Sequence, residues 1–108
     1  MAETGVNKPL KVAVVGAAGK MGQTALRCLS ADPSTEVVLA VGRREETILG
    51  IEVSTDLAAG LDRTQPDVLL ELTSAASAPG YVAMATQRGI SVVVGSTGVP
   101  FETLAKLS

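Results

Sequence analysis

Apolar residues follow two different spacings along the chain, and the order of these spacings predicts the fold. Residues 10–15, LKVAVV, are apolar except for Lys11 and rich in valine, which predicts a buried strand. Residues 20–31 predict a helix because apolar side chains recur three and four positions apart, at Met21, Ala25, Leu26, Cys28 and Leu29. A glycine-rich turn joins the two segments. The first part of the chain therefore predicts a strand, a turn and a helix.

This alternation continues toward the C-terminal end. Further strands are predicted at residues 36–41 (EVVLAV), 67–72 (DVLLEL) and 90–95 (ISVVVG). Residues 77–89 predict a helix that ends at Gly89, and Pro100 marks the start of another. Strands that alternate with helices over short loops are typical of a parallel sheet with helices on both faces. The sequence therefore predicts an α/β fold of the Rossmann type, a doubly wound parallel sheet of about five strands.

The segment from residue 48 to residue 60 has a less regular pattern. ILGIEV predicts a short strand, and STDLAAGL predicts a short helix capped by Ser54 or Thr55. No internal repeat interrupts the chain, and its 108 residues provide enough length for one hydrophobic core. We therefore expect one dinucleotide-binding domain over residues 10–108, preceded by a flexible tail at residues 1–9.

Composition narrows the classes of function. With one Tyr, one Phe and no Trp, the core must be aliphatic. A net charge of −2 with mixed signs favours neither nucleic acid nor a membrane as a partner. No apolar run reaches the roughly 18 residues needed to span a bilayer, so we expect a cytoplasmic protein. Cys28, the single cysteine, lies inside a predicted helix and is expected to be a small buried hydrophobe. The alternative is a reactive thiol, but no His is present to act as its base.

Three glycines lie three positions apart directly after the first strand: Gly16, Gly19 and Gly22 in VGAAGKMG. A helix N-terminus offers unpaired N–H groups, and glycine lets a phosphate approach without a Cβ in the way. Gly16 would form the tight turn, Gly19 would lie nearest the ligand, and Gly22 would let the helix pack closely. The G-x-x-G-x-x-G spacing lengthens the usual turn. These residues predict binding of a dinucleotide pyrophosphate, and the alternative is a plain strand-to-helix turn.

The end of the second predicted strand indicates which dinucleotide binds. An NAD site carries Asp or Glu there for the ribose 2′-hydroxyl, whereas this chain has Gly42, Arg43 and Arg44. Two guanidinium groups suit a 2′-phosphate, so the residues favour NADPH over NADH. Two alternatives remain open: the arginines belong to a solvated turn, or Glu45 or Glu46 reaches the ribose.

Three motifs in this order, VAVVGAAGKMG, DVLLELT and GISVVVGSTG, resemble the N-terminal, NAD(P)-binding domain of dihydrodipicolinate reductase (4-hydroxy-tetrahydrodipicolinate reductase) over nearly the whole chain. The resemblance implies an NAD(P)H-dependent oxidoreductase of lysine and diaminopimelate biosynthesis that transfers a hydride to a cyclic imine dicarboxylate. It also implies three sets of cofactor-binding residues: Gly16, Ala17, Ala18, Gly19, Lys20 and Met21 at the pyrophosphate, Arg43 at the adenosine ribose or its 2′-phosphate, and Leu72, Thr73, Gly95, Ser96 and Thr97 beside the nicotinamide.

The chain departs from the family pattern in three respects. Where the family commonly has Asp-Phe-Thr followed closely by Pro, residues 71–75 read ELTSA and lack the proline. Gly42 replaces the acidic residue of the second strand, which supports NADPH. The family's catalytic residues, a His pair, a Lys and an S-G-T loop, belong to a C-terminal domain that these residues lack, and the chain contains no His. The resemblance therefore implies no catalytic residue in this chain.

Three functions remain open at this stage. In the first, the chain is the cofactor-binding half of the reductase and is inactive alone. In the second, it is a non-catalytic nucleotide-binding or assembly module, whose uncovered strand at residues 90–94 pairs with another chain in a homo-oligomer. In the third, it is a Rossmann domain of the CoA-ligase type, which would bind CoA rather than NADPH. No metal site is expected.

Overall fold

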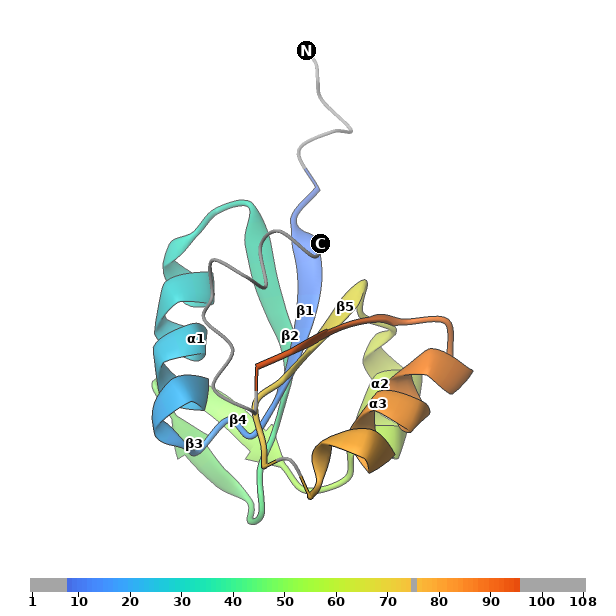
Figure 1. The fold of residues 1–108 in the computed structure, drawn as a ribbon. Helices are drawn as coiled ribbons and strands as arrows, with labels where there is room; N and C mark the ends of the chain where they lie inside the picture. Colours follow the sequence, from blue (N-terminus) through green and yellow to red (C-terminus); the bar gives the residue numbers. More distant parts are fainter. Residues whose placement is uncertain (1–7, 75, 96–108) are drawn as a thin grey trace.

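One twisted sheet organises the molecule (Figure 1). The computed structural model describes residues 8–74 and 76–95. Within these ranges the elements are β1 (Leu10–Val15), α1 (Lys20–Ala31), β2 (Thr35–Val41), β3 (Glu46–Ile48), β4 (Ile51–Ser54), α2 (Leu57–Thr64), β5 (Val68–Glu71), α3 (Ala78–Gln87) and β6 (Ser91–Val94). The strand order is β3-β4-β2-β1-β5-β6, with all neighbours parallel except the β3–β4 pair. The Rossmann-type α/β fold is confirmed.

Helices cover the two faces of the sheet unequally. Figure 1 shows α1 on one face and α2 with α3 on the other. Side chains of β1 alternate accordingly: Val12 and Val14 pack under α1, whereas Ala13 and Val15 pack in the cluster that includes α2 and α3 residues. All four are buried, which makes β1 the central strand of the core. The predicted strand at residues 10–15 and the predicted helix at residues 20–31 both agree with the structure.

The less regular middle segment forms a hairpin before α2. β3 and β4 pair antiparallel through a two-residue turn at Leu49 and Gly50, whose φ values are +54° and +78°. Two positive φ values define a type I′ turn, whose twist suits a hairpin. Only one strand, ILGIEV, was expected here, so this hairpin accounts for six strands in the described residues instead of about five.

The predicted cap of α2 is wrong by one or two positions. The carboxylate of Asp56 accepts a hydrogen bond from the N–H of Ala59 at 3.1 Å and is the N-cap. Ser54 cannot serve because it is the last residue of β4 and pairs with Val41 of β2. Thr55 lies between the strand and the cap.

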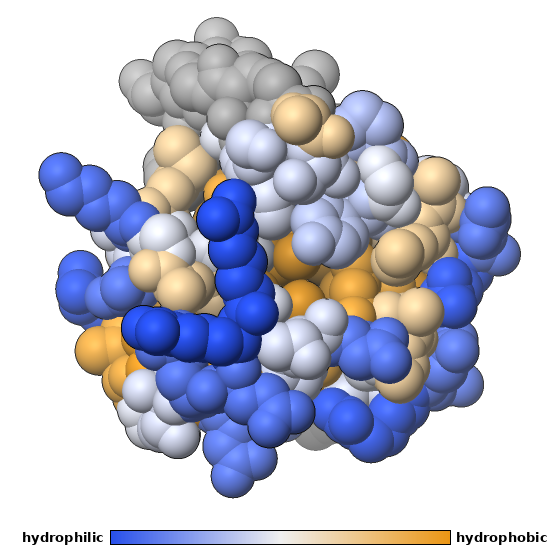
Figure 2. Space-filling model, turned by 90° about the horizontal axis from the view of Figure 1, so that it is seen from below, coloured by the Kyte–Doolittle hydropathy of each residue, from blue (hydrophilic) through white to orange (hydrophobic). Residues whose placement is uncertain are grey.

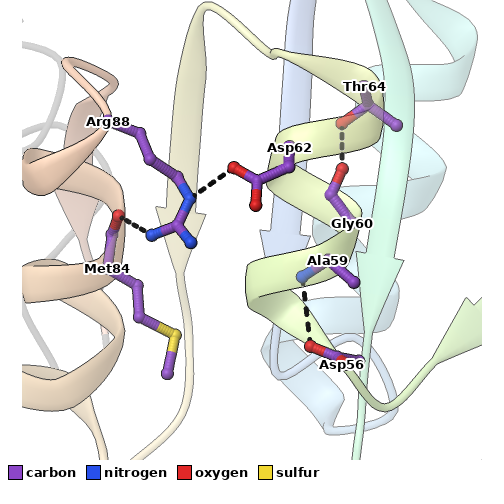
Figure 3. Close-up of polar contacts among 7 residues, drawn as sticks. All are labelled: Asp56, Ala59, Gly60, Asp62, Thr64, Met84 and Arg88. Carbon is purple, nitrogen blue, oxygen red and sulfur yellow. Dashed lines mark hydrogen bonds and ion pairs between the residues drawn. The ribbon is translucent and has the colours of Figure 1, made fainter.

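A polar contact joins α2 to α3, which cover the same face of the sheet (Figure 3). The Arg88 guanidinium donates to the carboxylate of Asp62 and to the carbonyl of Met84, each at 2.8 Å. The hydrogen bond from Arg88 lowers the pKa of Asp62. Arg88 therefore ties the end of α3 to α2, just before Gly89 turns the chain into β6 with a φ of +73°.

Cys28 is exposed, so its predicted burial is wrong. The core-facing side of α1 is formed by Gly22, Ala25 and Leu26, and Cys28 lies away from that side. None of the helices in the described ranges is long and apolar enough to cross a membrane. The helix expected after Pro100 lies outside the described residues.

We expect Leu49→Asn to stabilise the protein. Leu49 adopts a left-handed conformation that disfavours its Cβ, while its side chain is 54% exposed and contributes little burial. Asn tolerates this conformation, so the free energy of unfolding in urea should rise by about 0.5–1 kcal/mol. Leu10→Asn is the control, since Leu10 is also exposed but lies in a strand. An equal rise in the control would attribute the gain to lost surface hydrophobicity instead of the turn.

Candidate functional site

The carboxyl ends of β1, β2 and β5 meet around an open cavity of about 610 Å³. Its described lining is Val15, Gly16, Ala18, Gly19, Gly42, Arg43, Arg44, Glu46, Leu72, Thr73, Ser74, Ser77 and Tyr81. Figure 2 views this end of the sheet and shows apolar surface in a hollow, with strongly hydrophilic side chains beside it. In an open α/β sheet, ligands bind outside the carboxyl ends of the strands. A larger depression of about 990 Å³ along β2 and β4 contains none of the glycine-turn residues.

The glycine turn is held between its neighbouring strands. The N–H groups of Gly16 and Ala17 both donate to the carbonyl of Val41 at the end of β2, at 2.9 and 3.1 Å. Gly16 has a φ of +88°, and a Cβ placed there would lie 2.7 Å from the carbonyl carbon and oxygen of Leu72. Gly16 is therefore required both for the turn and for the close approach of the loop after β5.

The start of α1 offers free backbone donors to the cavity. Gly19 is the N-cap and supplies no capping side chain, and the first turn carries no acidic residue. The first N–H groups of a helix have no partner within it, and together with the helix dipole they favour an anion. A Cβ at Gly19 would meet only the carbonyl oxygen of Gly16, at 3.6 Å, so this side of the turn stays open. The arrangement suits a phosphate group.

Two arginines border the cavity on the β2 side. Arg43 and Arg44 follow Gly42, whose N–H donates to the carbonyl of Ser54 at 2.9 Å. Arg44 forms an ion pair with Glu46 at 3.6 Å and its side chain is 83% exposed, whereas Arg43 has no acidic partner among the described residues. Glu46 lines the cavity and Glu45 does not. Among the described residues at this wall, the Arg43 guanidinium thus remains available to an anionic ligand.

The loop after β5 forms the opposite wall. The N–H of Leu72 donates to the carbonyl of Val15 at 2.9 Å, which keeps the loop beside the end of β1. Glu71, the last residue of β5, is fully buried behind the wall. Its Oε2 accepts hydrogen bonds from the N–H of Thr73, at 3.0 Å, and from the Thr73 hydroxyl. Thr73 therefore has a fixed position at the cavity.

Most of the predicted cofactor-binding residues lie together, and the others have identifiable places. Seven of them line the cavity: Gly16, Ala18, Gly19, Arg43, Arg44, Leu72 and Thr73. Ala17 is buried beneath the turn, Met21 packs against the α1 cluster, and Lys20 is exposed. Gly95 lies next to the wall, since its N–H donates to the carbonyl of Glu71 at 2.8 Å. Ser96 and Thr97 lie outside the described residues.

Sequence reasoning missed four lining residues, Val15, Ser74, Ser77 and Tyr81. Ser77 is the N-cap of α3, and Tyr81 follows four positions later on the same side of the helix. A small polar residue just before the helix-starting Pro79 is a signal that could have identified Ser77, whereas the sequence gives no such signal for Ser74 or Tyr81. The described residues contain no cluster of His, Cys, Asp and Glu that could hold a metal ion.

Two alanine substitutions should distinguish the roles of Gly22 and Gly19. Gly22 is needed for close backbone packing, whereas Gly19 keeps the turn open to a ligand. At Gly22 a Cβ would lie 2.0 Å from the carbonyl oxygen of Gly16, so Gly22→Ala must displace backbone and should lower the free energy of unfolding by about 1–3 kcal/mol. Gly19→Ala serves as its matched control and should lower that energy by only about 0.5 kcal/mol, the cost of alanine at an N-cap. Urea denaturation measures both. Equal losses would contradict the assignment of different roles to the two glycines.

Comparisons with known proteins identify the family and the fold. The chain matches the family described as "Dihydrodipicolinate reductase, N-terminus" over residues 10–108. The 4-hydroxy-tetrahydrodipicolinate reductase of Moorella thermoacetica is 34% identical over an alignment 108 positions long. The alignment covers 91% of this chain and 40% of that protein. The chain thus spans about 40% of the length of the curated relatives it matches.

Solved structures show the same architecture. A dipicolinate-bound dihydrodipicolinate reductase from Paenisporosarcina sp. TG-14 has a TM-score of 0.74 at 24% identity, over 92% of this chain and 42% of that one, a likeness of fold alone. GenD2 from gentamicin A biosynthesis, solved in complex with NAD, has a TM-score of 0.72 at 28% identity, over 82% of this chain and 27% of that one. The family match extends over nearly the whole sequence, and the chain therefore belongs to the dihydrodipicolinate reductase family, of whose members it represents the N-terminal part.

Proposed function

We propose that this chain is the cofactor-binding half of an NAD(P)H-dependent 4-hydroxy-tetrahydrodipicolinate reductase, which transfers a hydride to a cyclic imine dicarboxylate. The observation that carries the proposal is that one cavity brings together the glycine turn, Arg43 and Thr73, which follow the ends of three adjacent strands. The family membership and the NAD bound to the related GenD2 support a nicotinamide dinucleotide as the ligand. When bound, this cofactor supplies the hydride.

Arg43 supports NADPH as the preferred cofactor. The residue after β2 is Gly42, so no carboxylate stands where an NAD site reads the ribose hydroxyl. The Arg43 guanidinium is exposed at the cavity and has the geometry to bind a phosphate through two hydrogen bonds. Glu46 favours the alternative, because its carboxylate lines the same cavity and could accept from a ribose hydroxyl if it left Arg44.

Catalysis requires, in this proposal, a further domain of the family. Residues 10–108 would form the dinucleotide-binding domain, with the pyrophosphate at the start of α1 and the nicotinamide beside Leu72, Thr73 and residues 95–97. The chain contains no His, and the His pair and Lys that the family uses to orient and protonate the imine are not among the described residues that line this cavity. The 108 residues alone are therefore expected to bind the cofactor without turnover.

Calorimetric titration of the chain with NADPH, NADH and CoA tests the proposal. We expect NADPH to bind most tightly, and Arg43→Ala to weaken NADPH by about ten- to hundredfold while leaving NADH nearly unchanged, because only NADPH carries the 2′-phosphate. Arg27→Ala is the control, since Arg27 is exposed on α1 and does not line the cavity. Equal weakening of both dinucleotides would remove the phosphate assignment, and binding of CoA alone would overturn the proposed function.

A second candidate is an assembly module, which the position of β6 favours. Within the described ranges β6 is an edge strand that pairs only with β5, and such an edge can pair with another chain. Under this candidate the chain forms a homo-oligomer, and light scattering after size-exclusion chromatography at two concentrations should give a mass above 11.0 kDa. A strict monomer at both concentrations would exclude pairing through β6.

A further inference from the structure

Glu71 is the one polar or charged residue that is fully buried in the described part of the chain. It lies two positions after Leu69 on β5 and so shares the face packed by α2 and α3. Its Oε2 accepts both hydrogen bonds from Thr73, and its Oε1 is buried without a partner among the described residues. An aliphatic residue would fill this position without an unsatisfied oxygen. A carboxyl group at this position therefore needs a reason, and its contact with Thr73 supplies one.

The contact determines what Thr73 offers to a ligand. A threonine hydroxyl has one proton, and Thr73 donates it to Glu71. The Thr73 oxygen can then only accept a hydrogen bond from any other group. Thr73 lines the cavity and Glu71 does not, so the cavity is presented with a hydrogen-bond acceptor whose position is set from behind.

Topology indicates which part of a dinucleotide meets this acceptor. β1 lies between β2, which is followed by Arg43, and β5, which is followed by Thr73. With the pyrophosphate at the start of α1 and the adenosine ribose at Arg43, the nicotinamide half extends toward β5. The polar substituent of the nicotinamide ring is a carboxamide, whose NH₂ group is a donor. Donor and acceptor are complementary.

We propose that Glu71 is a positioning residue, which holds Thr73 so that its hydroxyl oxygen accepts a hydrogen bond from the nicotinamide carboxamide of the bound cofactor. This inference rests on the proposed function. A ring held through its carboxamide does not turn over freely about its bond to the ribose, so one face of the reacting carbon is presented consistently. Glu71 itself does not touch the cofactor.

The test compares a dinucleotide with an analogue that cannot donate at this position. The ligands are NADP⁺ and its 3-acetylpyridine analogue, in which a methyl group replaces the NH₂, together with 2′,5′-ADP, which lacks the nicotinamide half; the NAD⁺ pair and ADP replace them if the chain prefers NAD⁺. Calorimetry on the wild-type chain should show about three- to tenfold tighter binding of the natural dinucleotide than of its analogue.

Variants then test whether Thr73 and Glu71 cause this preference for the natural dinucleotide. Thr73→Val and Glu71→Leu should abolish it and bind 2′,5′-ADP as the wild type does. Thr73→Ser and Glu71→Gln should keep it, because the serine hydroxyl and the glutamine oxygen preserve the contact. Thr86→Val is the matched control and should also keep it, since the Thr86 hydroxyl donates to the carbonyls of Val82 and Ala83 within α3. Thermal melting checks that each variant is folded.

The outcomes separate the two proposals. If the wild-type chain binds the dinucleotide and 2′,5′-ADP, but Thr73→Val retains the preference, the role of Thr73 and Glu71 is overturned and the proposed function stands. If Thr73→Val loses the preference and Glu71→Leu keeps it, Glu71 is not the positioning residue. If neither a dinucleotide nor its adenosine fragment binds the wild-type chain, the proposed function is wrong and this inference fails with it.

Discussion

Close contact between backbones at the glycine turn is the constraint on which the site depends. The turn after β1 must fit between the loop after β5 and the first turn of α1, and neither boundary leaves room for a side chain. Gly16 meets the carbonyl of Leu72, and Gly22 meets the carbonyl of Gly16. Because three segments meet here through main-chain atoms, the positions of the cavity walls are set by the sheet instead of by adjustable side chains. A site built in this way is preorganised.

The sheet and α1 could be predicted because each has a strong periodic signal. The valine-rich run of β1 and the spacing of Ala25 and Leu26 leave little ambiguity, and the elements agree with the structure. The middle segment could not be divided correctly, since its two short strands are joined by Leu49 and Gly50, and the leucine at the first turn position departs from the Asn-Gly or Asp-Gly signal of a type I′ turn. The burial of Cys28 was predicted wrongly because it lies at the border between the apolar and polar sides of α1, where the sequence pattern does not show whether a side chain faces the core.

Candidate site residues divide in the same way. Those next to a strand end, such as Arg43 and Thr73, could be identified because the carboxyl end of a parallel strand has a known relation to ligands. Tyr81 could not, because its presence in the cavity depends on where α3 begins relative to β1, which is a property of the tertiary structure. The burial of Glu71 was equally hidden, since a carboxyl group ending a strand is ordinarily solvated.

The order of the strands also has a consequence for folding. The hairpin of β3 and β4 pairs residues that are close in sequence. In contrast, β1 pairs with β5, which lies far along the chain, as Val12 does with Val68. Loop closure makes the second pairing the slower and more costly one. Both walls of the cavity depend on it, because Gly16 follows β1 and Leu72 follows β5. Recovery of ligand binding during refolding would therefore report the most distant contact of the sheet, whereas signals from the hairpin would recover earlier.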